Sequence, residues 1–170
     1  ITGDIGEAAR AVMAAGLAHV PITEGSGPLL LMAQVTGSIE TPIVVADLEA
    51  GPGSVTIKDL STASDLTVRA HLERDTLDLR EAHALYEGAT LNATGSVPVS
   101  LFTSTPASST APASLRATAT GITPAVLRGI LDPATLDDIS GAVDATLNVQ
   151  APSLDLARAT GDLTLTRLDL

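Results

Sequence analysis

The clearest pattern along this chain is the alternation of aliphatic and polar residues. In residues 65–72 and 89–99 an aliphatic residue recurs at almost every second position, with Thr, Asn, Arg or His between. Successive side chains of a strand point to opposite faces, so this alternation predicts strands with one apolar and one polar face. Further strand-length runs are 29–37, 43–50, 54–60, 76–79, 82–88, 114–121, 142–150 and 159–170.

The connections between these runs are short, and their length decides the fold class. Parallel strands need crossover connections of about a dozen residues or more, whereas antiparallel neighbours are joined by short turns. An antiparallel sheet can also be apolar on one face and solvated on the other. The sequence therefore predicts a mainly β fold built on an antiparallel sheet, with two short helical insertions.

The two helical insertions have local signals of their own. Residues 6–18 are rich in Ala, and Pro21 closes the stretch. The second insertion begins at Thr123-Pro124, a helix-capping residue followed by proline at the first helical position. The same signal recurs ahead of residues 133–140, where we expect another short helix.

An internal duplication indicates how the chain is organised. A Thr-Gly pair, a helical stretch, a Ser-Gly pair and strands follow one another twice in that order. We predict a first repeat unit over residues 1–102, a flexible Ser/Thr/Pro loop over 103–114 and a second, truncated unit over 115–170. Such a unit predicts that the chain is a segment of a longer repetitive protein. The Thr-Gly pairs are predicted bend points of the sheet; they begin at Thr2, Thr36, Thr94, Thr120 and Thr160.

Composition and charge exclude several classes of function. The chain has one Phe, one Tyr and no Trp, which favours thin aliphatic layers over one deep core. Its net charge of -11 argues against binding to nucleic acid and to anionic headgroups. Because Cys is absent, disulfides, thiolate metal sites and a cysteine nucleophile are excluded.

No residues form a catalytic or metal-binding motif. His19, His71 and His83 lack a partner at i,i+4 spacing, which favours structural or surface roles. Residues 51–55 (GPGSV) lack the lysine of a phosphate loop and are predicted to form a tight turn. Residues 25–27 (GSG) lack the strand–turn–helix context of a nucleophile elbow. We therefore expect no enzyme, no metal and no cofactor.

The apolar face of the predicted sheet has two interpretations. It packs against helices or a second sheet, or it stays partly open and binds an apolar ligand. The scarcity of aromatic residues and the repeated aliphatic strands favour the second interpretation.

Three segments carry a resemblance to a known family. Residues 76–101 (TLDLREAHALYEGATLNATGSVPVSL), 29–48 (LLLMAQVTGSIETPIVVADL) and 138–149 (DISGAVDATLNV) resemble phrases that recur in the TamB (translocation and assembly module subunit) family and its AsmA-like relatives. The resemblance covers about residues 22–170 apart from the Ser/Thr/Pro loop. Each phrase alone would match many β proteins, so the signal lies in their order.

The resemblance implies a place in the cell and a function. Members are anchored in the inner membrane and cross the periplasm of Gram-negative-type bacteria. Their strands form an elongated open groove, called a β-taco, with an aliphatic interior. They are implicated in phospholipid transport and in outer-membrane biogenesis with an Omp85-type outer-membrane partner. Phospholipid acyl chains are thus the implied ligands.

The candidate lipid-groove residues all belong to the apolar phase of the alternation. They are Leu29, Leu31, Val35, Leu66, Val68, Leu72, Leu77, Leu79, Leu91, Val97, Val99, Val143, Leu147, Val149, Leu163 and Leu165. A structural or protein-binding β module stays open as the alternative. Such a module would be an adhesin-like repeat or a chaperone groove that adds a client strand to its edge.

Overall fold

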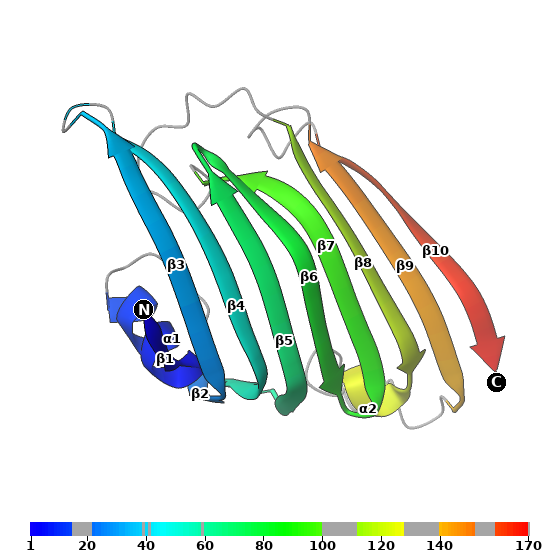
Figure 1. The fold of residues 1–170 in the computed structure, drawn as a ribbon. Coiled ribbons are helices and arrows are strands. Elements are labelled where there is room, and N and C mark those ends of the chain that lie inside the picture. Colours follow the sequence, from blue (N-terminus) through cyan, green and yellow to red (C-terminus); the bar gives the residue numbers. More distant parts are fainter. Residues whose placement is uncertain are drawn as a thin grey trace.

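The computed structural model describes residues 1–14, 22–38, 40, 42–58, 60–99, 112–127, 140–151 and 159–169. Ten strands form one sheet in the order β1-β3-β4-β5-β6-β7-β8-β9-β10, and β2 also pairs with β4 (Figure 1). The elements are β1 (Thr2–Asp4), α1 (Ile5–Ala14), β2 (Ile22–Ser26), β3 (Pro28–Gly37), β4 (Pro42–Ile57), β5 (Thr62–Glu73), β6 (Thr76–Tyr86), β7 (Ala89–Pro98), β8 (Ala113–Ile122), α2 (Pro124–Leu127), β9 (Ala142–Ala151) and β10 (Thr160–Asp169).

The predicted fold class is confirmed. Every strand pair is antiparallel, and the sheet is open because β1 and β10 lie at opposite ends of the strand order rather than beside each other. Figure 1 shows β3 to β10 side by side, with α1 beside the N-terminal edge and α2 below β7 and β8. The described helices therefore lie at the margins of the sheet.

Two strands are longer than the alternation predicts. Residues 51–55, predicted as a tight turn, lie inside β4, so that prediction is wrong. The ladder between β4 and β5 shifts register at Ala50/Gly53 and Gly53/Val55, and this irregularity lets the strand continue through the Gly-Pro-Gly segment. Residues 76–79 and 82–88, predicted as two strands, mostly form the single strand β6, with a register shift between Leu79 and Ala82.

Some predicted elements extend beyond the described residues. Residues 15–21 and 128–139 are not described, so the ends of both predicted helices and most of the predicted helix at 133–140 lie outside the described part of the chain. Of the predicted loop 103–114, residues 103–111 lie outside it as well, while Ala113 and Ser114 begin β8. The division into two repeat units stays a prediction.

Asp4 connects the start of α1 to the turn between β2 and β3. Its Oδ1 accepts a hydrogen bond from the Gly6 N–H at 2.8 Å, and its Oδ2 accepts one from the Gly27 N–H at 3.0 Å. The Ile5 N–H donates to the Gly27 carbonyl oxygen at 2.9 Å. Asp4 therefore caps the helix and holds it against the neighbouring turn.

The glycines of residues 25–27 and 51–55 have a packing role at the same place. Ile5 is only 8% exposed, and a Cβ atom on Gly53 would lie 2.7 Å from its Cδ1. A Cβ atom on Gly27 would lie 3.1 Å from the same atom. The backbone at these two glycines thus forms a socket in which the Ile5 side chain packs.

The Thr-Gly pairs take several conformations rather than one. Gly37 and Gly121 have positive φ angles of 91° and 72°, at the end of β3 and at the register shift of β8. Gly95 lies in the middle of β7 opposite Leu79 and Leu115. A Cβ atom there would collide with the Ser114 carbonyl oxygen. Close backbone approach therefore explains Gly95.

Removal of the helix cap is expected to destabilise the fold. Asp4→Ala deletes both side-chain bonds at the α1 junction and should lower the free energy of unfolding by about 1–2 kcal/mol. Asp4→Asn keeps one acceptor oxygen and should lose less. Thermal unfolding followed by circular dichroism measures both; equal losses for the two variants would contradict the capping role.

A methyl group at Gly95 is expected to disturb the β7–β8 ladder. Gly95→Ala should cost about 1–3 kcal/mol, or several degrees in Tm, because the Ser114 carbonyl must move. Gly3→Ala is the matched control, since a Cβ atom there meets nothing within 4 Å. The same thermal melts test this, and a similar Tm for both variants would refute the collision.

Candidate apolar ligand-binding face

The strand register places the aliphatic phase of every long strand on one side of the sheet, which we call the apolar face. One row across the sheet illustrates this, because its members are cross-strand partners in turn. The row consists of Leu29, Ala50, Val68, Ala82, Ala93, Ala117, Leu147 and Leu163. Among the described side chains of β3 to β10, no charged residue shares this face.

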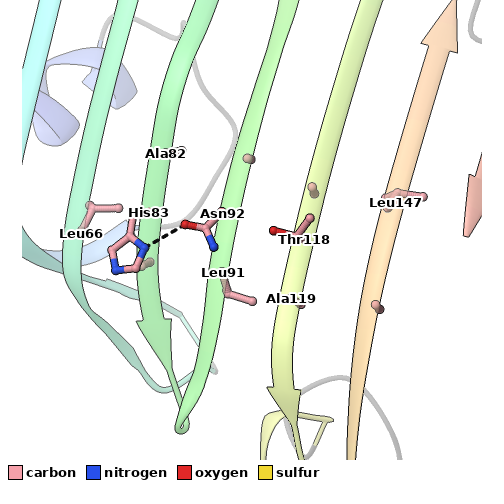
Figure 2. A pocket seen from close by; sticks show the side chains of 12 residues that line it. Leu66, Ala82, His83, Leu91, Asn92, Thr118, Ala119 and Leu147 are labelled. Carbon is pink, nitrogen blue, oxygen red and sulfur yellow. Dashed lines mark hydrogen bonds between the residues drawn. The ribbon is translucent and has the colours of Figure 1, made fainter. Parts of the chain in front are cut away.

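A trough of about 410 Å³ lies on the apolar face between β5 and β9. Figure 2 shows its lining residues spread over these neighbouring strands. The side chains of the apolar phase that line it are Leu66, Ala82, Ala84, Leu91, Ala93, Ala117, Ala119, Ala145 and Leu147. His83, Asn92 and Thr118 of the opposite phase also border the trough. The trough has the volume of a small-molecule site, and almost all of its exposed lining is apolar.

Alanine creates the depth of this trough. Ala82, Ala93 and Ala117 are consecutive cross-strand partners and form its floor. Larger side chains flank the floor at Leu66 and Leu147, on β5 and β9. Neighbouring strands lie about 4.8 Å apart, so the trough extends for about 19 Å across the strands. The long axis of the trough therefore runs across the strands rather than parallel to them.

Within the described part of the chain, no second layer covers the apolar face. The most exposed aliphatic side chains on this face are Val35 (65%), Leu163 (65%) and Leu165 (60%), on the two outermost long strands. Leu147, at the end of the trough, is 38% exposed. Only small residues such as Ala46, Ala50 and Ala70 are buried on it, between larger neighbours.

The opposite face carries the charges and most hydrogen-bonding side chains. The His71 Nδ1 lies 2.7 Å from Asp47 Oδ1, and Arg80 Nη1 lies 3.6 Å from the same oxygen. His71 lies on this polar face, and its side chain is only 18% exposed. These cross-strand pairs stabilise the sheet modestly, by about 0–1 kcal/mol each at exposed sites.

His83 belongs to the polar face as well, although it borders the trough. It alternates with Ala82 and Ala84, and its Nδ1 lies 2.9 Å from Asn92 Oδ1 (Figure 2). Its Nε2 lies 3.4 Å from Asp65 Oδ2. The ring is held by polar neighbours across strands, so it has a structural role on that face.

The structure brings the predicted lipid-groove residues together on the apolar face, with one partial exception. Val99 follows the last residue of β7, and its N–H donates to the Asp75 carbonyl oxygen at 2.7 Å. Only Leu66, Leu91 and Leu147 of the predicted set line the trough. The remaining members extend the apolar face on both sides of it.

Sequence reasoning missed the alanines that form the trough. The alternation assigns Ala93 to the apolar phase of β7, which was a usable signal. Ala82 and Ala84 could not be assigned to the apolar phase from the alternation, because β6 changes phase between Leu79 and Ala82. The predicted set contains only the larger aliphatic residues, so it includes the flanking leucines of the trough but not the alanines of its floor.

Comparisons with protein-family models, with curated proteins and with solved structures gave no significant match. The resemblance to the TamB and AsmA-like phrases thus rests on the residues quoted above. Among the described residues no group of three or more His, Asp or Glu is placed to hold a metal ion. No helix in the described part of the chain is long and apolar enough to span a bilayer.

A charge placed in the trough is expected to abolish its affinity for apolar molecules. Ala93→Glu puts a carboxylate on the alanine floor, where desolvation of the charge costs several kcal/mol. Binding of a neutral apolar fluorophore, followed by its emission, should weaken at least tenfold. Thr94→Glu is the matched control on the exposed polar face and should bind as the parent does. Equal binding by both variants would show that the fluorophore sits elsewhere.

Proposed function

We propose that the apolar face binds the hydrocarbon chains of phospholipids and forms one section of a lipid-conducting groove. In this proposal the parent protein carries phospholipid across the periplasm towards the outer membrane, as the TamB and AsmA-like resemblance implies. The single observation that carries the proposal is a continuous, charge-free aliphatic face without a second layer over the described residues.

Energetics favour a hydrocarbon ligand for such a face. Each methylene moved from water into an apolar site gains about 0.8 kcal/mol, so two chains of roughly 15 methylenes avoid a cost of about 24 kcal/mol. A path that keeps these chains covered removes most of the barrier to transfer between membranes. The face offers such a path because the aliphatic row from Leu29 to Leu163 runs uninterrupted from β3 to β10.

The side chains of the trough also suit movement rather than fixed binding. Ala93, Ala117 and Leu147 offer dispersion contacts but no hydrogen bond or charge that would fix a ligand in one position. Phe, Tyr and Trp, which would add large local contact areas, are absent from its lining. A chain of methylenes would therefore meet similar contacts at each step along the sheet.

The competing function is a structural or protein-binding module. The open edges of the sheet favour it, since an unpaired strand offers hydrogen-bonding groups to a client strand. It differs from the lipid proposal in the chemistry of what contacts the face. A polypeptide client would occupy an edge or the face, whereas a lipid would occupy the trough.

Photo-crosslinking at two positions of β7 tests the proposal. A diazirine amino acid at Leu91 points into the trough, and one at Thr94 lies on the exposed polar face outside it. In cells, Leu91 should label phospholipid at least several-fold more than Thr94. Mass spectrometry of the crosslinked adducts identifies the ligand.

A second pair of positions guards against a local artefact. Val97 on the apolar face should label lipid, whereas Thr90 on the polar face should not. Equal lipid labelling at both members of each pair would refute the proposal. Labelling of polypeptide instead of lipid at Leu91 and Val97 would establish the protein-binding alternative.

A further inference from the structure

The trough on the apolar face is built from two neighbouring cross-strand rows. In each row the residues are register partners from β6 to β9. One row consists of Ala82, Ala93, Ala117 and Leu147, and the other of Ala84, Leu91, Ala119 and Ala145. Same-face residues of one strand lie about 6.7 Å apart, and this is the spacing of the two rows. The rows therefore define a channel that crosses the strands.

Leucines flank this channel at both ends. Leu66 on β5 and Leu147 on β9 line it there, whereas most lining positions between them are alanine (Figure 2). Beyond Leu147 lies its partner Leu163 on β10, which is 65% exposed, compared with 38% for Leu147. A hydrocarbon chain that extended past either leucine would therefore lose part of its cover. The trough lies inside the sheet, between β4 and β10, so its shape requires no free strand edge.

The length of the trough corresponds to one linear hydrocarbon chain. Carbon–carbon bonds of about 1.5 Å at near-tetrahedral angles advance an extended chain by about 1.25 Å per carbon. The trough extends about 19 Å across the strands, which corresponds to about 15 carbons. Each leaflet of a bilayer has a hydrocarbon thickness of about 15 Å, so membrane lipids have chains of this size.

The cross-section of the trough also corresponds to one chain. A volume of about 410 Å³ over a length of about 19 Å gives a mean cross-section of about 22 Å². Extended hydrocarbon chains in van der Waals contact lie about 4–5 Å apart, so each has a cross-section of about 20 Å². Two chains side by side would need about twice this area. The trough therefore has room for a single chain.

From these dimensions we infer that the trough takes one linear hydrocarbon chain of about 15 carbons at a time, extended across β5 to β9. A phospholipid enters with one of its chains in the trough, and the second chain lies outside it. A lipid with a single chain is held by its whole hydrocarbon part. This inference deepens the proposed function and rests on it only in taking a lipid as the ligand.

A chain-length series of lysophosphatidylcholines tests the predicted size. Each member has one chain and the same zwitterionic headgroup, so only the chain length changes. Competition with a neutral apolar fluorophore, below the micelle concentration, measures their affinity for the full protein chain. Affinity should rise about twofold per methylene, because the trough is open on one side and covers about half of each methylene. The rise should level off near 15 carbons, where the trough ends.

Two substitutions in the lining should shift this limit in opposite directions. Ala117→Leu obstructs the floor at β8 and should lower the limit to about 10 carbons. Leu147→Ala opens the end towards Leu163 and should raise the limit by about four carbons. Thr120→Leu is the matched control, because Thr120 is exposed on the polar face of the same strand as Ala117. The control should keep the limit of the parent, and circular dichroism spectra of all variants should match that of the parent.

Stoichiometry measures how many chains the trough holds. Ala93→Glu removes the apolar floor, so the difference in bound lipid between this variant and the parent counts the molecules in the trough. Equilibrium dialysis with a saturating lysophosphatidylcholine near the length limit should give a difference of one molecule per protein chain. A difference of two molecules would overturn the single-chain inference.

The remaining outcomes separate this inference from the proposed function. An affinity that rises steadily well past the predicted limit, or a limit that is the same in Ala117→Leu, Leu147→Ala and the parent, overturns the inference. If Leu91 still labels phospholipid in cells, the proposed function then stands without it. A limit that shifts as expected, without phospholipid labelling in cells, would support the single-chain trough and overturn the proposed function.

Discussion

Cross-strand hydrogen bonding determines which side chains share a face, and the rest of this structure depends on it. Few side chains are buried, and none of the described polar or charged ones is. Slippage of one strand by a single residue would turn its charges onto the apolar face and its aliphatics into the polar one. The register is thus the property that creates one apolar face from an otherwise ordinary alternation. Asp4 and the glycine socket for Ile5 hold the N-terminal margin of that sheet in place.

The two faces of the sheet make different kinds of interaction. Charged and hydrogen-bonding side chains gather on the polar face, where pairs such as Arg69–Glu81 at 3.2 Å link neighbouring strands. The net charge of -11 opposes non-specific association of an apolar-rich chain. The other face is left free of charge, so contacts on it are dispersive and similar from strand to strand.

Alternation and the short connections between the runs were sufficient to predict the fold class, most strands and the apolar face. It failed where glycine or a bulge changes the phase. The Gly51–Gly53 segment suggests a turn by composition, yet β4 passes through it because β2 and β5 pair with the strand on both sides. The phase change before Ala82 depends on pairing with β5 and β7, which local sequence does not encode. The trough was missed for the same reason, since its floor depends on which alanines become neighbours.

The register shift in β6 has a consequence for how such a sheet evolves. In a regular strand, gain or loss of one residue reverses every side chain beyond it and is eliminated by selection. At Arg80 and Glu81 the extra length is absorbed within the strand, and the aliphatic side chains resume on the same face at Ala82. Strands of this sheet therefore accept odd changes in length at such points. Related sequences are therefore expected to differ by insertions and deletions in the middle of strands, and not only in the turns.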